Sequence, residues 1–141
     1  MLQIVNVNEG TYKDAYNFLC SVPSITDVDV DILNNGVIVM DDDRVIGSIS
    51  FELYDNIGLI RYFVFKKNLP NSILCDLLER LEANARLLKL NSLVCVADNV
   101  QIENLFKELN FFKIDSYIFI NEEKIENTSF KSSSFLQKKL N

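Results

Sequence analysis

Histidine is absent from this 141-residue sequence, and cysteine occurs only three times, as Cys20, Cys75 and Cys95. No two of these cysteines are spaced as a CxxC pair. The chain therefore lacks the side chains of a cysteine–histidine zinc site and those of Ser-His-Asp or Cys-His catalysis, and we predict no metal site. All three cysteines stand among apolar neighbours, which indicates buried, reduced thiols.

The sequence also lacks a long apolar run and an N-terminal signal. No segment approaches the roughly 18 apolar residues that a membrane-spanning helix needs. The first ten residues, MLQIVNVNEG, have neither the basic region nor the apolar core of a secretory signal. We therefore expect a cytoplasmic protein with no membrane partner.

The charge balance is acidic. Lysine and arginine number 14 against 20 aspartates and glutamates, which gives a net charge of −6, and there is no dense basic run. A protein that binds nucleic acid needs basic side chains to displace counterions from phosphates, so nucleic acid is not an expected partner. The acidity has two interpretations: simple solubility, or attraction of a cationic substrate such as an amine.

What the sequence does contain is the composition of a globular domain, with 48% hydrophobic and 24% charged residues. Its length suits one domain over residues 1–141. Residues 3–7 predict a strand and residues 11–20 an amphipathic helix. Residues 24–35 leave two alternatives open, a short strand or a short helix with a loop. The tail, residues 122–141, is interpreted as a loop plus a last strand or as a disordered end.

Three strands are predicted next, at residues 37–40, 44–53 and 57–65, with polar turns between them. The last of these is apolar on nearly both faces, which indicates a central strand. In the second strand, strict alternation divides the side chains between two faces. One face carries Val45, Gly47, Ile49, Phe51 and Leu53, and the other carries Ser48, Ser50 and Glu52. Together the three strands predict an antiparallel meander.

A long amphipathic helix is the clearest element of the second half. Residues 71–88 carry apolar side chains at i, i+3 and i+4 spacing, and residues 92–97 predict a short buried strand. A strand, a helix and a strand in this order imply parallel pairing, so the sheet should be mixed. Asn110 stands where the end of a second helix favours a left-handed residue, and residues 111–121 predict a further strand. The apolar stripe of that second helix is Ile102, Leu105, Phe106 and Leu109.

Two segments in this order resemble the Gcn5-related N-acetyltransferase (GNAT) family. The first is VFKKNLPNSILCDLLERLEANARLL, residues 64–88. The second is NVQIENLFKELNF, residues 99–111, which is similar to the family's N-x-x-A-x-x-L-Y-x-x-x-G-F segment. The resemblance covers residues 37–112 best. It implies an α/β (α+β) fold with a mixed, mostly antiparallel sheet of six to seven strands, flanked by about four helices.

The resemblance implies acetyl-CoA as the cofactor and direct transfer of its acetyl group to an amine. Backbone groups of the central strand would pair with the pantetheine arm as an added strand does. The start of the long helix would face the pyrophosphate, because a helix N-terminus has unpaired N–H groups and a partial positive charge. The cofactor-binding residues implied in this way are Phe63, Val64, Phe65, Asn71, Ser72, Ile73, Leu74 and Asn99.

The loop before that helix departs from the family's R/Q-x-x-G-x-G/A pattern, because it contains no glycine. Glycines let phosphates approach the backbone closely, and Pro70 also removes one N–H group. The pattern's three defined positions fall on Leu69, Ser72 and Leu74. The nearby cations that could substitute charge for amides are Lys66 and Lys67.

The sequence assigns no catalytic residue. Members of the family often use a carboxylate on the central strand as general base and a tyrosine of the last helix as acid. Ile60 and Arg61 stand at the first position here, and Phe106 stands at the second. Arg61 cannot accept a proton near neutral pH. The side chains that could stand in are Glu52, Tyr62, Cys95 and Tyr117.

Three interpretations of function are open at this point. The first is a GNAT-like N-acyltransferase that transfers an acetyl or acyl group from acyl-CoA to a small-molecule or peptide amine. The second is a non-catalytic GNAT-fold binding or regulatory module that has lost the CoA loop and the catalytic groups. The third is an unrelated small α/β protein. Exposed strand edges and the aromatic-rich residues 111–120 could also support a homodimer.

Overall fold

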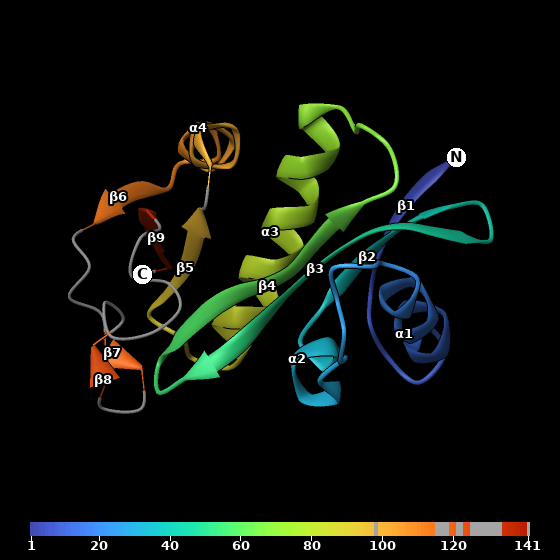
Figure 1. The fold of residues 1–141 in the computed structure, drawn as a ribbon, viewed down its shortest axis with the longest axis horizontal. Helices are drawn as coiled ribbons and strands as arrows, with labels where there is room; N and C mark the ends of the chain where they lie inside the picture. The colour runs from blue at the N-terminus through green and yellow to red at the C-terminus, as the bar shows by residue number, and fades with distance from the viewer. Residues whose placement is uncertain (98, 115–118, 121–122, 125–133, 141) are drawn as a thin grey trace.

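The computed structural model describes residues 1–97, 99–114, 119–120, 123–124 and 134–140, which contain both strands and helices (Figure 1). Their bounds are β1 Leu2–Asn6, α1 Tyr12–Cys20, α2 Val30–Asn34, β2 Val37–Asp41, β3 Arg44–Tyr54, β4 Ile57–Phe65, α3 Asn71–Leu87, β5 Ser92–Ala97, α4 Val100–Glu108, β6 Phe112–Ile114, β7 Phe119–Ile120, β8 Glu123–Lys124 and β9 Ser134–Lys139. Seven strands form one sheet in the order β1-β2-β3-β4-β5-β9-β6, and β7 pairs with β8 separately.

The main sheet is mixed. The strands β1 to β4 form an antiparallel meander, β5 pairs in parallel with β4, and β9 runs antiparallel between β5 and β6. The crossover through α3 makes the parallel pair possible, because strands of the same direction need a long connection. The fold predicted from the sequence, a mixed and mostly antiparallel sheet of six to seven strands with about four helices, is confirmed.

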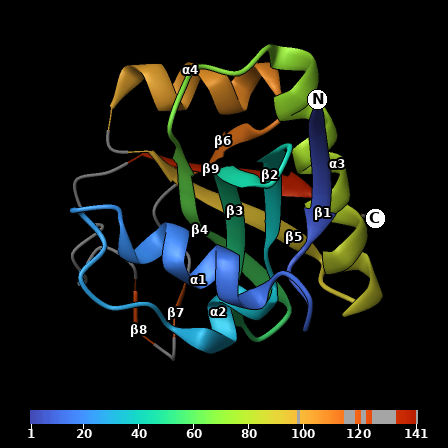
Figure 2. The ribbon, with the colours of Figure 1, turned by 90° about the vertical axis from the view of Figure 1, so that its right-hand side faces the viewer.

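Helices cover both faces of this sheet, and Figure 2 shows strands lying between α1 and α3. On one face, Phe18 of α1 and Leu33 of α2 pack against Ile38 of β2. On the other face, α3 packs against side chains such as Phe51, and α4 joins the same cluster through Phe106. Because helices cover both faces, the central strands are apolar on both sides.

The helix α3 forms because its apolar residues recur every three or four positions and line one side. Leu77, Leu81 and Ala85 are buried against the sheet, whereas Leu87 at the end of the helix is 82% exposed. The chain then turns at Lys89, which has a left-handed φ of 61°. No helix in the described part of the chain is long and apolar enough to cross a membrane.

The side-chain alternation predicted for residues 44–53 is wrong for Val45 and correct for Ile49 and Phe51, which pack in the same cluster. Val45 packs with the cluster under α1 and α2, whereas Ile46 and Ile49 pack on the side of α3. The cause is a register shift in the β2–β3 ladder, which leaves Ile46 without an opposite residue, as in a β-bulge. Since both faces of β3 are apolar, hydrophobic alternation does not reveal such a bulge.

Residues 24–35 form a loop followed by the short helix α2, so the strand alternative for this segment is wrong. The Asp29 side chain caps the helix by accepting from the N–H groups of Asp31 at 2.9 Å and Ile32 at 3.4 Å. The alternating aspartates imitate the period of a strand. Aspartate nevertheless favours helix starts, because its short side chain pairs with free backbone donors.

The prediction of buried cysteines is correct for Cys95, which lies in β5, and wrong for Cys20 and Cys75, which are exposed. Both exposed cysteines belong to helices, Cys20 to α1 and Cys75 to α3. Their apolar sequence neighbours lie on the buried side of each helix. Neighbours in sequence therefore say little about a helical residue, because successive side chains point about 100° apart.

The C-terminal strands bring distant segments together, since the predicted last strand forms β9 and lies between β5 and β6. The prediction of a single strand for residues 111–121 is wrong, because β6 ends at Ile114 and Phe119–Ile120 form β7 in the separate sheet. Residues 115–118 and 121 of that prediction lie outside the described residues. Phe112 is 74% exposed on the edge strand β6. The homodimer that exposed strand edges and residues 111–120 suggest stays a prediction.

Asn110 follows α4 in the left-handed conformation that the sequence predicts, with a φ of 71°. We expect Asn110→Val to lower the free energy of unfolding by about 1–2 kcal/mol, which is the usual cost of this conformation for a residue with a bulky Cβ. Asn110→Gly should be neutral or slightly stabilising, because glycine adopts the conformation freely. Urea unfolding measures both variants, and equal stabilities would contradict the assigned conformation.

Candidate functional site

The strands β4 and β5 run side by side only at their beginnings. Beyond three paired positions, β4 continues to Phe65 and β5 to Ala97, and no residues of the two strands pair in these described stretches. Figure 1 shows the two arrows separating toward the end where α3 begins. An extended ligand could therefore pair with this half of β4 as an added strand. The three pairs are Ile57 with Ser92, Gly58 with Leu93 and Leu59 with Val94.

A bulge in β4 lies in the opening, which is the stretch beyond Leu59 and Val94 where β4 and β5 no longer pair. Ser48 pairs with Val64 and Ser50 pairs with Arg61, so one residue of β3 stands opposite two residues of β4. Tyr62, at the bulge, has a left-handed φ of 54°. Such an extra residue bends a strand and changes the direction of the side chains around it. As a result, Arg61 and Tyr62 are neighbours on one face, with the guanidinium carbon 5.6 Å from the centre of the tyrosine ring.

The hydroxyl of Tyr62 ties the bulge to the loop between α1 and α2. It accepts from the Asp29 N–H at 2.8 Å and donates to the Asp27 carbonyl at 3.5 Å. A left-handed conformation costs a residue such as tyrosine about 1–2 kcal/mol, and these bonds help to offset that cost. Tyr62, one of the candidate stand-ins, therefore has a structural role, and its hydroxyl is already engaged.

The start of α3 lies at the open end of the two strands (Figure 1). Pro70 is the cap residue, and its carbonyl accepts from Ile73 at 3.0 Å and from Leu74 at 3.2 Å. Within the described chain, the N–H groups of Asn71 and Ser72 have no acceptor, and both residues are exposed. Free N–H groups and the helix dipole make such a helix start attractive to phosphate oxygens.

The bulky side chains of the glycine-free loop point largely inward. Leu74 is only 9% exposed, and Leu69 packs against the main core cluster together with Ile73. Leu74 thus fills the interior and does not obstruct the helix start. Pro70 is the N-cap residue of α3, so the N–H group that it lacks comes before the first residue of the helix. The N–H groups of Asn71 and Ser72 are kept.

Both lysines before the loop have partners. Lys67 Nζ lies 3.0 Å from Asp41 Oδ2, and its hydrogen bond and charge hold the pKa of that carboxyl below its usual value. Lys66 Nζ lies 5.3 Å from the centre of the Phe18 ring. Both lysines are exposed, and exposed ion pairs are worth little, so an arriving phosphate could compete for them.

An aromatic cluster joins β4 to α4. The Phe63 ring lies 4.9 Å from the Phe65 ring and 5.2 Å from the Phe106 ring, and Phe106 lies 5.0 Å from Phe111, measured between ring centres. These edge-to-face contacts hold α4 against the end of β4. Phe106 is 1% exposed and carries no hydroxyl, so it cannot protonate a departing thiolate.

The predicted cofactor residues of β4 and α3 meet at this end of the sheet. Phe63, Phe65 and Ile73 pack against one core cluster, whereas Val64 faces the cluster under α1 and α2. Asn99 is engaged locally, because its side-chain oxygen accepts at 2.9 Å from the N–H group three residues further along α4. Asn99 thus acts as a helix cap in this structure.

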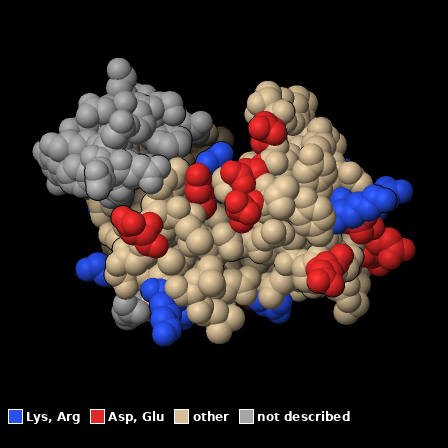
Figure 3. Space-filling view, turned by 90° about the horizontal axis from the view of Figure 1, so that it is seen from below, with Lys and Arg blue, Asp and Glu red and all other residues tan. Residues whose placement is uncertain are grey.

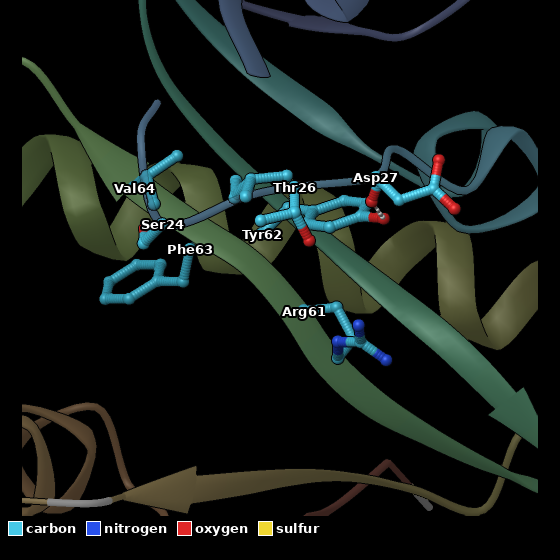
Figure 4. A pocket seen from close by; sticks show the side chains of 8 residues that line it. Ser24, Thr26, Asp27, Arg61, Tyr62, Phe63 and Val64 are labelled. Atoms are coloured by element: carbon cyan, nitrogen blue, oxygen red, sulfur yellow. Dashed lines mark hydrogen bonds between the residues drawn. The ribbon is translucent and has the colours of Figure 1, made fainter. Parts of the chain in front are cut away.

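A cavity of about 300 Å³ lies against the bulge. Figure 4 shows the Tyr62 ring beside Asp27 and the Arg61 side chain separate from them. This volume suits a small molecule or the end of a larger one. Sequence reasoning missed the loop between α1 and α2, because nothing in the sequence shows which strand that loop crosses. The lining residues are Ser24, Ile25, Thr26, Asp27, Arg61, Tyr62, Phe63 and Val64.

A carboxylate of β3 holds Arg61, whose Nη1 donates to Glu52 Oε1 in a close ion pair. Tyr54 joins the pair: burial raises the pKa of Tyr54 to about 12, and its hydrogen bond to Glu52 and the charge of that carboxylate add to the effect. Ile60, the other position at which the family places a base, is buried in the core. Neither Ile60 nor Arg61 supplies a carboxylate.

The high pKa of Tyr54 predicts a late ionisation. The folded chain favours the neutral phenol, so this contribution to stability is complete below the unfolded pKa near 10 and is lost as the pH rises through about 12. Absorbance titration should show one tyrosine ionising later than the others, and Tyr54→Phe should remove that step. Glu52→Gln should bring the step to lower pH. A late step that persists in Tyr54→Phe would contradict the assignment.

The remaining stand-ins supply no evident acid or base. Cys95 is 3% exposed inside β5. Glu52 is paired with Arg61. Tyr117 lies outside the described residues. In the part of the chain that the structure describes, no three cysteine, aspartate or glutamate side chains gather in a way that could hold a metal ion.

No family model matches the chain, and a search of curated proteins finds no match. Solved structures do match. A GNAT-family acetyltransferase from Staphylococcus aureus Mu50 superposes with a TM-score of 0.65, at 14% identity over 100% of both chains. N-acetylglutamate synthase from Neisseria gonorrhoeae, complexed with coenzyme A and N-acetyl-glutamate, gives 0.74 at 14% identity, and the chain spans 35% of that protein. The yncA protein of Salmonella typhimurium, solved with its cofactor acetyl-CoA, gives 0.62 at 16% identity over 99% of this chain and 94% of that one.

These likenesses define the class of structure: the chain has the GNAT fold, as its sequence resemblance predicts. The parting of β4 from β5 and the position of α3 are features of this chain's own structure. At such low identity a shared fold does not by itself carry an activity, so the function has to be argued from the site.

Proposed function

We propose that the chain is an acyl-CoA-dependent N-acyltransferase that passes an acetyl or acyl group to the amine of a small molecule or peptide. One observation carries the proposal: β4 and β5 separate after Leu59, and the free N–H groups of Asn71 and Ser72 lie at the open end. The strand edge suits the amide-bearing pantetheine arm, and the helix start suits the pyrophosphate. The likeness to proteins solved with coenzyme A or acetyl-CoA supports this proposal.

In this proposal the chain mainly positions the reactants. Acetyl-CoA would supply a thioester, an acetyl group already activated toward amines. Backbone groups of Phe63 to Phe65 hold the pantetheine arm, and the cavity beside Tyr62 holds the amine against the same strand. Such proximity replaces a collision in solution. The ammonium form of the acceptor first gives one proton to solvent. The free amine then attacks the thioester, and the second proton that leaves nitrogen as the amide forms ends on the sulfur of CoA as its thiol.

The missing acid and base make a slow enzyme the expectation, because each such group contributes on the order of 10²–10⁴ to a rate. The same gaps favour the second candidate, a non-catalytic GNAT-fold binding or regulatory module. Phe106 is the specific observation behind it, since its ring is sealed in the aromatic cluster and offers no proton. Absence of acyl transfer to every amine tested would support this module.

Asn71→Pro tests the proposed cofactor site directly. Asn71 is the first residue of α3, a position that proline tolerates, so the change removes one free N–H group and should leave the fold stable. If that N–H binds a phosphate oxygen, calorimetric titration should show acetyl-CoA binding weakened about tenfold, as the loss of a charge-assisted hydrogen bond implies. We expect a micromolar dissociation constant for the unchanged chain.

Val100→Pro is the matched control, because Val100 is the first residue of α4 and is 67% exposed. It makes the same chemical change on another helix and should leave the affinity for acetyl-CoA unchanged. Absence of binding at millimolar acetyl-CoA would remove the proposal. Equal weakening by both proline variants would show that the start of α3 does not hold the cofactor.

A further inference from the structure

The ion pair between Arg61 and Glu52 is shared by two neighbouring cavities. Arg61 lines the cavity at the bulge. Glu52 instead lines a second cavity of about 550 Å³ beside α2, together with Asp29 and Asp31. The cation of the pair therefore faces one cavity and the anion faces the other. On the face seen in Figure 3, acidic side chains gather near the middle and a basic side chain stands beside them.

Arg61 is held in place on two sides. Its Nη1 donates to Glu52, and its guanidinium carbon lies 5.6 Å from the centre of the Tyr62 ring. Within the described residues, that single ion pair is the charged contact of Arg61, and a guanidinium has five donors in a planar fork. A second edge of the fork thus remains for a ligand, and a carboxylate matches it in shape and charge.

The cavity at the bulge presents charges of both signs. Arg61 supplies a positive group, and Asp27, exposed on the loop between α1 and α2, supplies a negative one. We propose that the acceptor is an amine that also carries a carboxylate, such as an amino acid, with Arg61 binding its carboxylate and Asp27 attracting its ammonium group beside the bulge. This inference rests on the proposed acyltransferase function and names its substrate class.

A polyamine fits this cavity less well. If one of its ammonium groups lay beside Asp27, another would face the guanidinium of Arg61, and the ligand has no carboxylate to offer Arg61. Like charges in such a confined space repel, whereas a carboxylate gains a charge-assisted hydrogen bond. The neighbouring acidic cavity is lined by Glu52 and by the start of α2, where the Asp29 carboxylate already caps the helix. The guanidinium, in contrast, still has donors to offer.

Ligand-detected NMR on the full chain tests the substrate class without acyl transfer. The probes are a mixture of free amino acids, the same amino acids as carboxyl amides, and the diamine putrescine. The free acids should bind at least about tenfold more tightly than their amides and than putrescine. Arg61→Gln should abolish that preference, and Arg61→Lys should keep only part of it, because lysine keeps the charge and loses the fork. Arg80→Gln, a change of an exposed arginine on α3, is the matched control and should keep the full preference.

A parallel titration with acetyl-CoA separates the two proposals. If acetyl-CoA binds and the amides or putrescine bind as well as the free acids, the substrate class is wrong and the acyltransferase proposal stands. If the free acids are preferred through Arg61 and acetyl-CoA does not bind, the activity is wrong and the ligand class stands. A preference that survives Arg61→Gln, or no binding of any probe, overturns the inference.

Discussion

Replacing Leu81 by alanine is expected to lower the free energy of unfolding by about 3–5 kcal/mol. The side chain is fully buried where α3 packs on the sheet, so the change removes apolar contacts and leaves a cavity. Leu87→Ala is the matched control, because it makes the same change on the same helix at a side chain that is 82% exposed. It should alter stability by less than about 0.5 kcal/mol. Urea unfolding followed by circular dichroism measures both variants.

The outcome for Leu81 bears on function as well as on folding. The helix can offer its free N–H groups to a cofactor only if its packing fixes their position relative to the end of β4. A loss below about 1 kcal/mol for Leu81→Ala would mean that α3 does not pack on the sheet as described. The helix start would then have no defined place at the opening between β4 and β5.

The triple variant Leu69→Arg, Pro70→Gly and Ser72→Gly should bind acetyl-CoA at least about tenfold more tightly than the unchanged chain. The first change adds a guanidinium that suits phosphate. The second restores the missing cap N–H, and both glycines let the phosphates approach the backbone more closely. Leu74 is left in place, because it is 9% exposed and its removal would cost about 2–5 kcal/mol of stability.

S-acetyl pantetheine is the control ligand for the triple variant, because it carries the thioester and the arm without the pyrophosphate. Its affinity should be the same for both chains, while that of acetyl-CoA rises in the variant. The Ser72→Gly change lies inside the helix and should lower stability by up to about 1 kcal/mol, which does not affect this comparison. If the affinity for acetyl-CoA stays unchanged, the sequence of this loop does not limit cofactor binding, and the contact between Phe63 and Phe106 is the next place to examine.

The fold was predictable from the sequence wherever a local pattern determines an element. The stripe of α3 and the order of strands and helices depend on side-chain periods within short windows, and both predictions are confirmed. The positions of Val45 and Ile46 were not predictable in this way, because they follow from the register between two apolar strands. The exposed Cys20 and Cys75 show the same limit for single residues on helices.

The candidate site was predictable only in part. The family resemblance assigned the cofactor to the end of β4 and the start of α3, and the structure brings these two segments to the same end of the sheet. The pairing of Arg61 with Glu52 was not foreseen, since the two residues meet across two strands and beside a bulge. The lining contributed by the loop around Asp27 was also missed, because such long-range contacts leave no periodic signal in a single sequence.

Backbone-amide NMR of the isotope-labelled chain during a titration with acetyl-CoA tests most directly whether the thioester cofactor lies along the free half of β4 with its pyrophosphate at the start of α3. The largest shifts should fall on the N–H groups of Phe63, Phe65, Asn71 and Ser72, and they should saturate together. Shifts concentrated on β1 and β2 with these four amides unmoved, or an unchanged spectrum at millimolar acetyl-CoA, would show that this opening is not a cofactor site.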